Sequence, residues 1–353
     1  MSNKEKTLVV LTPAFPANEK EEDWIPFQQM LLRSIKKIYP SIKIIVLSFI
    51  YPANNTKYTW NEITVFPSNG NKYRKLKRPL LWKLIWKKLN EINKEHKIDT
   101  ILSLWCGECS LVGSYFGKMK SVKHFTWICG QDARKNNKMV KFIRPSPDEL
   151  IAMSDFLVDD FYRNHHIKPA HVIPGGLDLS MYNNENETRD IDIAGAGSLV
   201  PLKRYDIFID VVAELKNKIP GIKAVLCGDG GDAEQLRKRI GSYLLQENVQ
   251  LTGMITPRET IKMMHRSKVF LHPSSYEGFS MACYEALFAG AHVISFVKTM
   301  YQEIPHWHVV RSKEEMQQKA FELLNDPKLA NEPIFTYSMD NSAAAMIKLF
   351  GLS

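Results

Sequence analysis

The stretch SSYEGFSMACYEALFAGAHVI (274–294) places two glutamates, Glu277 and Glu285, in a run of otherwise small or apolar residues. Ionised carboxylates are rarely buried unless a partner stabilises them, so both residues require a physical reason. KVFLHP (268–273) precedes the stretch and HVISF (292–296) ends it, and both segments are typical of buried strands. The order strand, loop, helix, strand is the repeating unit of an α/β protein with a parallel sheet.

Residue types divide this stretch into a loop and a helix. Ser280 is a favourable N-cap for a helix over 281–289, and Gly290 is a favourable residue for its end. Glu277 then lies in the loop at the carboxyl end of the strand, whereas Glu285 lies in the second turn of the helix. Ligands of open α/β sheets bind at this end of the strands, so both carboxylates are candidate site residues.

The predicted helix N-terminus suits a diphosphate. The backbone amides of Gly278, Phe279 and Ser280 lie there and form an array that binds anions. A neighbouring carboxylate would repel phosphate unless it binds hydroxyl groups. The two glutamates therefore predict a nucleotide-sugar, with its diphosphate in the middle and sugar hydroxyls on either side. A structural alternative stays open, in which Glu277 caps its own loop and Glu285 pairs with a surface lysine or arginine.

Strand-like and helix-like segments alternate along all 353 residues, a length that suggests about two domains. The expected strands are 7–11, 42–48, 100–105, 123–128 and 149–154, followed by 191–197, 222–228, 249–253, 268–273 and 292–296. The polar segment YNNENETRD (182–190) carries no periodic apolar signal and is typical of a linker. We expect two Rossmann-like α/β domains that face each other across a cleft, 1–187 and 188–337, with a final helix at 338–353 that packs back on the first.

A second phosphate contributor is expected in GAGSLVPLKRYD (195–206), the turn after the first strand of the second domain. Gly197 lies in this turn, and Lys203 and Arg204 open the next helix, where basic side chains can neutralise a diphosphate. Gly228 follows the next strand in GDGGD (228–232). It either lets a ligand approach the backbone or forms a plain strand-to-helix turn.

The chain is basic, with a net charge of +9 and an isoelectric point near 9.1. Much of the excess lies in 72–97, where Trp82 and Trp86 are one helical turn apart. Two interpretations stay open. The segment is a solvated helix that packs through Leu81, Leu84, Ile85 and Leu89, or its basic face rests on an anionic membrane surface, on the inner face of the plasma membrane. We find no nucleic-acid recognition motif, so no nucleic-acid partner is expected.

Other features exclude several protein classes. No apolar run approaches the roughly 20 residues of a membrane helix, and the start of the chain lacks a signal-peptide pattern, so we expect a cytoplasmic protein. Cys106 and Cys109 form a single C-x-x-C pair without further zinc ligands at suitable spacing. Asp190 and Asp192 precede a strand, at the end of the sheet away from the site. We therefore expect no metal ion and no cofactor.

Several of these motifs, in this order, resemble one family. The pattern Glu277-x7-Glu285 resembles the nucleotide-sugar signature of retaining GT-B glycosyltransferases of the family-4 type, also called glycosyl transferases group 1. GSLVPLKRYD (197–206) resembles the glycine-to-lysine segment of that family, and VIPGGLDLSMY (172–182) resembles its hinge-side segment. The resemblance covers about 154–296 and implies a GT-B architecture.

The resemblance also implies roles for individual residues. Glu285 would hold the ribose hydroxyls, and Glu277 would stabilise the transferred sugar together with the loop that follows it. Lys203 would neutralise the departing diphosphate. The further donor-binding candidates are Gly278, Phe279, Ser280, Gly197, Ser198, Arg204 and Gly228. Ser198 stands where the family often has an arginine, a charge for which Arg204 would compensate.

The first domain departs further from the family pattern. The usual pair of glycines after the first strand is replaced by PAFPANEKEEDWIPF (13–27), and the acceptor-side histidine of the family has no plain counterpart. WICGQDAR offers Asp132 as a catalytic candidate, and SLWCGECS offers Trp105 and Glu108 as acceptor-side candidates. His124 lies inside an expected strand and is interpreted as a packed core residue.

The resemblance predicts a hexosyltransferase that moves a sugar, with retention, from a UDP- or GDP-sugar to a glycan or lipid-linked saccharide in surface polysaccharide or glycoconjugate synthesis. Three alternatives stay open. A nucleotide-sugar epimerase would use the same donor without an acceptor, a phosphorylase would respond to inorganic phosphate, and an inactive scaffold of the same fold would turn over no donor.

Overall fold

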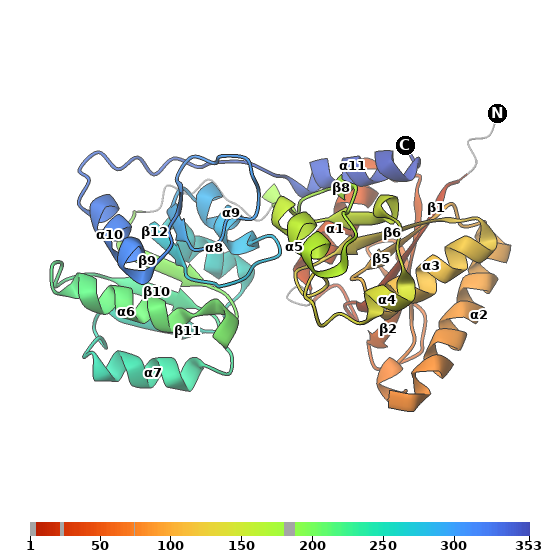
Figure 1. Cartoon of the computed structure of the whole chain (residues 1–353), viewed down its shortest axis with the longest axis horizontal. Helices are drawn as coiled ribbons and strands as arrows, with labels where there is room; N and C mark the ends of the chain where they lie inside the picture. Colours follow the sequence, from red (N-terminus) through yellow and green to blue (C-terminus); the bar gives the residue numbers. More distant parts are fainter. Residues whose placement is uncertain (1–4, 22–24, 74, 180–187) are drawn as a thin grey trace. The chain divides into compact units, whose positions relative to one another are not determined.

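The computed structural model describes residues 5–21, 25–73, 75–179 and 188–353. The chain forms two compact units, Met1–Gly176 with Tyr337–Ser353 (unit 1) and Leu177–Thr336 (unit 2) (Figure 1). Each unit contains its own sheet and its own hydrophobic core. Most of the predicted linker, 182–190, lies outside the described residues. In the parts that the structure describes, every helix is too short or too polar to cross a lipid bilayer.

Unit 1 is built on an eight-stranded sheet of order β3-β4-β2-β1-β5-β6-β7-β8. Its strands are β1 (Thr7–Ala14), β2 (Lys43–Tyr51), β3 (Tyr58–Trp60), β4 (Ile63–Pro67), β5 (Thr100–Leu104), β6 (Lys123–Ile128), β7 (Leu150–Ala152) and β8 (His171–Val172). All neighbours pair in parallel except β3 and β4. β1 is central and fully buried along Leu8–Leu11, with Val9 paired to Ile45 on one side and to Ile101 on the other. This explains why its sequence is continuously apolar.

The helices of unit 1 are α1 (Pro26–Ile38), α2 (Arg78–His96), α3 (Glu108–Lys120), α4 (Met139–Ile143), α5 (Asp155–His165) and α11 (Met339–Phe350). The last of these, α11, comes from the end of the chain and packs against α1. Phe350 stacks on Phe125 with ring centroids 4.9 Å apart, and Lys37 pairs with Asp340 at 2.7 Å. The end of the chain is therefore part of the core and surface of unit 1.

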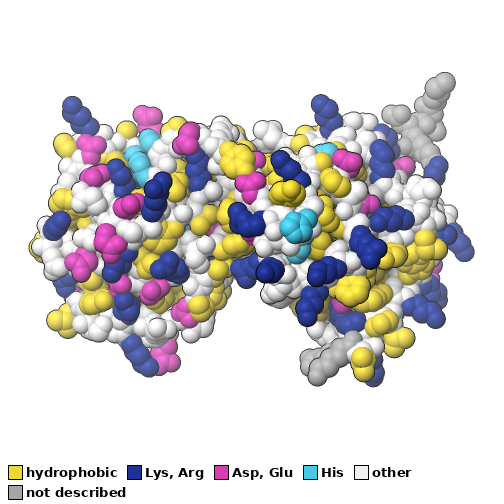
Figure 2. Space-filling view, in the orientation of Figure 1, with side chains coloured by type: hydrophobic (Ala, Val, Ile, Leu, Met, Phe, Trp, Pro, Cys, Tyr) yellow, Lys and Arg dark blue, Asp and Glu magenta, His cyan; other side chains and the backbone are white. Residues whose placement is uncertain are grey.

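The basic segment 72–97 forms α2 over most of its length. Leu81, Ile85, Leu89 and Ile92 form its buried stripe. The predicted inward position of Leu84 is wrong, because the turn of about 100° per residue places it at the edge of this stripe, 39% exposed. Figure 2 shows lysine and arginine side chains intermingled with hydrophobic ones over this part of unit 1.

Unit 2 is built on a six-stranded, wholly parallel sheet of order β11-β10-β9-β12-β13-β14. The strands are β9 (Ile191–Ala196), β10 (Ala224–Cys227), β11 (Val249–Gly253), β12 (Ser267–His272), β13 (His292–Ser295) and β14 (Trp307–Val309). The helices are α6 (Tyr205–Lys216), α7 (Ala233–Ser242), α8 (Pro257–His265), α9 (Met281–Phe288) and α10 (Lys313–Leu324). Apolar side chains of α6 and α10 pack together in the core that covers one face of this sheet.

The strand order of unit 2 reverses between β9 and β12. From β9 the chain moves outward through β10 to β11, and from β12 it moves the other way through β13 to β14. The chain therefore leaves the carboxyl ends of the neighbouring strands β9 and β12 in opposite directions along the sheet. In open α/β sheets this switch point is where ligands bind. The segments 197–204 and 273–280, both singled out from the sequence, are the two loops at this point.

Candidate functional site

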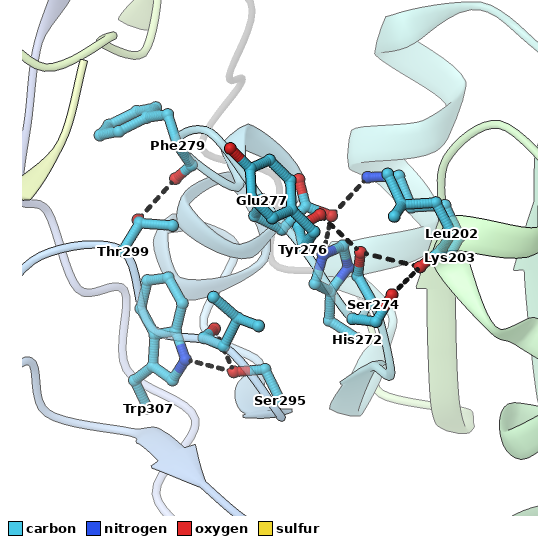
Figure 3. Close-up of polar contacts among 12 residues, drawn as sticks. Leu202, Lys203, His272, Ser274, Tyr276, Glu277, Phe279, Ser295, Thr299 and Trp307 are labelled. Atoms are coloured by element: carbon cyan, nitrogen blue, oxygen red, sulfur yellow. Dashed lines mark hydrogen bonds and ion pairs between the residues drawn. The ribbon is translucent and has the colours of Figure 1, made fainter. Parts of the chain in front are cut away.

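The two loops at the switch point of unit 2 are joined through one backbone carbonyl. The oxygen of Leu202 accepts hydrogen bonds from the amide of Ser275 at 3.0 Å, from its hydroxyl at 3.2 Å and from the hydroxyl of Ser274 at 3.3 Å (Figure 3). Ser274 also donates to the carbonyl of Tyr276 at 3.1 Å. These bonds fix the distance between the loop after β9 and the loop after β12. They hold Lys203, next to Leu202, beside Glu277.

Glu277 lies in the loop after β12, as predicted, and its side chain is largely buried. The Nζ atom of Lys203 lies 2.6 Å from its Oε1, and the Nε2 atom of His272 lies 2.8 Å from the same oxygen (Figure 3). Burial alone would raise the pKa of Glu277, but the hydrogen bonds and positive charge of His272 and Lys203 outweigh it and hold the pKa at about 2. Glu277 is therefore an anion at neutral pH. The alternative in which it only caps its own loop is wrong.

His272 is a residue of this site that the sequence analysis missed. It is the last residue of β12 and is 1% exposed. Its Nε2 hydrogen points at the Glu277 carboxylate, while its buried Nδ1 atom has no partner among the described residues. A polar residue at the carboxyl end of an otherwise apolar strand was the available signal. Because the ring is enclosed, it fixes the position of the carboxylate that it contacts.

Glu285 lies in α9, on the predicted second turn, and is half-buried. Its carboxylate makes no ion pair and no hydrogen bond with the residues that the structure describes, so the predicted alternative of a surface lysine or arginine partner is wrong. Burial raises the pKa of Glu285 to about 7. A half-buried carboxylate without a partner among the described residues can accept hydrogen bonds from ligand hydroxyl groups. Such perturbed carboxylates concentrate at functional sites.

The helix α9 begins and ends where the sequence predicted, but Ser280 does not cap it with its side chain. Ser280 has a left-handed backbone (φ 61°), and its carbonyl accepts the first helical bond from Cys283 at 2.9 Å. Its buried hydroxyl has no partner in the described part of the chain. The preceding Phe279 is fixed on both sides, since its carbonyl accepts from Thr299 at 2.9 Å and its ring stacks on Tyr284 at 4.5 Å (Figure 3). The helix therefore presents an unused hydroxyl at its N-terminus.

Glycines 197 and 228 bring the ends of β9 and β10 together. Both have positive φ, 149° and 133°, and a Cβ atom on Gly228 would lie 2.0 Å from the carbonyl oxygen of Gly197. Gly195, predicted in the same turn, instead lies inside β9. Ser198, the residue after Gly197, is exposed. The two strand ends thus form a close backbone contact that only glycine at 228 permits.

Arg204 does not join the Lys203–Glu277 pair. Its backbone is left-handed (φ 51°), and its guanidinium lies 5.5 Å from the centroid of the Phe296 ring. The structure therefore leaves Lys203 as the cation that contacts Glu277. The predicted compensation for the missing arginine at position 198 stays a prediction.

The two aspartates at the start of β9 have structural partners. Asp190 forms a bidentate pair with Arg266 at 2.8 and 2.6 Å, and Asp192 pairs with Lys268 at 2.8 Å. These contacts support the interpretation that the D-x-D pattern is not a metal site. Within the described ranges, no group of three histidine, cysteine or acidic side chains is placed to hold a metal ion, and Cys106 and Cys109 are buried free thiols.

The acceptor-side candidates lie in unit 1, after the carboxyl ends of β5 and β6. Glu108 is held by Arg78, whose Nε atom lies 2.7 Å from its carboxylate, so it is not free to accept a proton from a substrate. Trp105 has a positive φ of 68° and packs edge-on against Phe27 at 5.4 Å. Both residues thus have partners in this unit, and their acceptor-side roles stay predictions.

Asp132 is 4% exposed, and its carboxylate accepts the amide hydrogen of Cys129 at 2.8 Å. Burial raises its pKa to about 7, against the opposing effect of backbone hydrogen bonds from Cys129 and Cys106. These contacts stabilise the turn after β6, and a catalytic role stays a prediction. His124 is the packed core residue that the sequence indicated, with Nε2 2.9 Å from the Ser103 hydroxyl and a pKa that burial lowers to about 3.

Residues 181–334 match the family model described as "Glycosyl transferases group 1". Among curated proteins, the chain is 32% identical over 99 residues to 2-deoxystreptamine N-acetyl-D-glucosaminyltransferase of Niallia circulans, a match to 28% of this chain and 25% of that protein. It is 27% identical over 183 residues to the gpi3 subunit of phosphatidylinositol N-acetylglucosaminyltransferase of Schizosaccharomyces pombe, covering 50% and 40% of the two chains. The matches thus span less than half the length of these relatives.

Solved structures match nearly the whole chain. The structure of TarM aligns with a TM-score of 0.68 at 14% identity over 98% of both chains. Anabaena Alr3699/HepE in complex with UDP and glucose aligns with a TM-score of 0.65 at 16% identity, covering 98% of this chain and 95% of that one. The fold is therefore GT-B, as the sequence resemblance implied.

Proposed function

We propose that this protein belongs to the glycosyl transferases group 1 family and moves a sugar from a nucleoside diphosphate sugar to a saccharide or lipid-linked saccharide acceptor, with retention at the anomeric carbon. The observation that carries the proposal is the pair of glutamates at the switch point of unit 2. One is ionised and held by Lys203 and His272, and the other is unpaired and half-buried.

The proposed donor site uses each carboxylate for a different sugar. Glu285, without a protein partner, accepts hydrogen bonds from the ribose hydroxyls. The contacts of Glu277 with Lys203 and His272 both fall on Oε1, so Oε2 is available for a hydroxyl of the transferred sugar. The negative charge of Glu277 also stabilises positive charge that develops at the anomeric carbon. The unpartnered hydroxyl of Ser280 at the N-terminus of α9 donates to the diphosphate between the two sugars.

Lys203 stabilises the leaving group in the proposed reaction. The bond between the anomeric carbon and the phosphate oxygen breaks, and its electron pair leaves on the diphosphate. The acceptor hydroxyl oxygen forms the new bond, and its proton passes to the departing diphosphate. The ammonium of Lys203 stands beside Glu277 and supplies fixed positive charge for the leaving group.

We propose UDP-N-acetylglucosamine as the first donor to test. Curated relatives from Niallia circulans and Schizosaccharomyces pombe carry N-acetylglucosaminyltransferase names. The pneumococcal O-GlcNAc transferase GtfA and Anabaena Alr3699/HepE were solved with UDP. The candidate donors that the family resemblance implies also include GDP-sugars, which serve as the comparison.

The test is donor turnover by the purified full chain. UDP-N-acetylglucosamine, UDP-glucose and GDP-mannose are each supplied with a panel of saccharide acceptors, and the released nucleoside diphosphate is measured. Acceptor-dependent release that Glu277→Gln abolishes supports the proposal. Conversion of the donor without an acceptor assigns an epimerase, and turnover that requires inorganic phosphate assigns a phosphorylase. No turnover of any donor by folded protein contradicts the enzyme and favours an inactive scaffold.

We further propose that 72–97 rests on the anionic inner face of the plasma membrane, where lipid-linked acceptors would be accessible. Lys83 and Lys87 are exposed on α2, and neither forms an ion pair within the described residues. Each such lysine near an anionic surface contributes about 1 kcal/mol of attraction, which salt screens. Sedimentation with anionic vesicles that is stronger at low salt than at high salt, and weaker with neutral vesicles, is the expected result. Binding that ignores both variables would contradict an electrostatic surface.

A further inference from the structure

Unit 1 contains an open apolar groove between α2, α3 and α4, beside the buried stripe of α2. The groove has a volume of about 570 Å³. It is lined by Trp82, Lys83, Trp86, Leu111, Val112, Tyr115, Met139 and Phe142. Lys83 is the one charged side chain among these eight. The volume falls in the range of roughly 300–1,000 Å³ that is typical of small-molecule sites.

The walls of this groove are fixed, and they are not filled by the chain itself. The hydroxyl of Tyr115 on α3 donates to the carbonyl of Phe142 on α4 at 3.3 Å, and Trp86 on α2 packs edge-on against Phe116 at 5.2 Å. Yet Phe142 is 65% exposed and Tyr115 is 50% exposed. Met119, one turn beyond Tyr115, is 70% exposed. A contiguous exposed apolar surface of this kind marks a binding site.

The rim of the groove is cationic. Lys83 lines the groove, Lys87 follows it by one turn on α2, and Lys138 lies directly before α4, and all three lysines are exposed. In the parts of the chain that the structure describes, no ion pair neutralises any of them. The acidic residues of these helices are engaged elsewhere or lie beyond the groove, since Glu108 pairs with Arg78 and Glu91 with Lys88.

We propose that this groove, defined by the eight lining residues above, binds an acyl chain of an anionic membrane lipid, with the lipid phosphate on the rim lysines. An apolar slot with a cationic edge is complementary to an amphiphile that has an acyl tail and an anionic head. Tryptophan and tyrosine, which have an apolar body and a polar tip, suit the boundary between tail and headgroup. The inference rests on the proposed membrane association, and it is independent of which sugar is transferred.

Lipid binding by the groove and binding by a surface that only attracts charge should respond differently to salt. Electrostatic attraction weakens as salt rises, whereas burial of an acyl chain does not. We therefore expect that part of the binding to phosphatidylglycerol vesicles survives high salt. We also expect acyl chains brominated near the headgroup to quench tryptophan fluorescence, because Trp82 and Trp86 line the groove.

The first test fills the groove in the full chain with Leu111→Phe and Met139→Phe together. Met254→Phe, on a 76% exposed apolar residue of unit 2, is the matched control. The filled variant should lose the quenching and the salt-resistant binding, and it should keep the salt-sensitive binding. The control should match wild type, and unchanged thermal unfolding shows that both variants are folded.

The second test removes the rim charge with Lys83→Ala, Lys87→Ala and Lys138→Ala together. Partitioning to phosphatidylglycerol vesicles should fall by roughly 100-fold at low salt, as expected for three lysine contacts with an anionic surface. Arg237→Ala with Lys238→Ala, on exposed residues of α7, is the control that should change nothing.

Three results overturn the proposal. These are quenching in the filled variant that equals wild type, an absence of quenching in wild type, and a change of oligomeric state in the filled variant without lipid, which would assign the groove to a second copy of the chain. Quenching by monomeric brominated lysophosphatidylglycerol without vesicle sedimentation would contradict only the membrane surface. Donor turnover measured on the same variants separates failure of sugar transfer from failure of the lipid site.

Discussion

The Nε2 atom of His272 lies 2.8 Å from Oε1 of Glu277, so a buried histidine at the end of β12 fixes the carboxylate in the loop that follows. Lys203 reaches the same oxygen at 2.6 Å from the loop after β9. Residues from both sides of the switch point thus converge on one carboxylate. Glu277 is therefore ionised and held in one orientation, whereas Glu285 has no partner among the described residues.

We expect His272→Ala to slow turnover by roughly 10- to 100-fold, because a hydrogen bond to a buried charged group is lost. His272→Gln, whose amide can still donate, should recover most of the activity. The pKa of Glu277 is held at about 2, and activity that needs its ionised form is lost as pH falls through that pKa. In His272→Ala this pKa rises, so the acid limb of the kcat profile should move to higher pH.

The control for this prediction is His308→Ala, since His308 lies in β14, away from the two loops. An acid limb and a kcat in His272→Ala that equal those of the control would show that the histidine does not position Glu277.

Lys203→Met should lower kcat by roughly 100-fold, the size of effect expected when one preorganised charge on a transition state is removed. The KM for the donor should change less, because the charge on the diphosphate is greatest once the anomeric bond has broken. Lys223→Met, on an exposed lysine before β10, should behave as wild type. A loss confined to KM would assign Lys203 to ground-state binding alone.

Gly228→Ala should disrupt the close contact between the ends of β9 and β10. Its Cβ atom would lie 2.0 Å from the carbonyl oxygen of Gly197, at a φ of 133° that alanine rarely adopts. We expect the free energy of unfolding to fall by about 1–3 kcal/mol and nucleotide binding to weaken. Gly231→Ala is the matched control three residues later, where an added Cβ would meet no atom within 4 Å. Equal urea midpoints for the two variants would contradict this account.

Glu285→Gln should stabilise the free protein at neutral pH. The pKa of Glu285 is about 7 in the folded chain, above its ordinary value of 4.5, because burial disfavours the charge. A raised pKa means that the stability from this group is complete below about 4.5 and is lost as pH rises through 7. The variant does not titrate, so its advantage should grow over that range to about 1–3 kcal/mol and then level off. Thermal unfolding from pH 4.5 to 8 measures it.

Glu247→Gln, on an exposed glutamate, is the control and should show no pH-dependent difference from wild type. If the stability difference between Glu285→Gln and wild type is also independent of pH, burial does not disfavour the charge of Glu285 in the folded chain.

Five of the six strands of unit 2, β9 to β13, were predictable because each is a short apolar run bounded by glycine, proline or polar residues. The alternation of strand-like and helix-like segments along the sequence places 197–204 and 273–280 at strand ends. It does not show that the two loops are neighbours, since that depends on the order β10-β9-β12-β13. The Glu277–Lys203 contact spans 74 residues in sequence and follows from this order.

Other features depended on tertiary contacts that no local pattern carries. The short strands β3, β4, β8 and β14 were not predicted. Ser280 has the residue type of an N-cap, but its left-handed backbone turns the hydroxyl away from that role. Glu108 was a candidate on composition alone, and only its contact with Arg78 shows that it is engaged.

The central claim is that Glu285 holds the ribose of a nucleoside diphosphate. Binding of two ligands to wild type and to one variant tests it directly. UDP and 2′,3′-dideoxy-UDP are titrated calorimetrically into wild type and into Glu285→Gln at pH 8, where the carboxylate is ionised. Wild type should prefer UDP by roughly 10- to 100-fold, the value of hydrogen bonds between hydroxyls and a charged acceptor, and the variant should lose most of this preference. The same preference for UDP in both proteins would contradict the assignment.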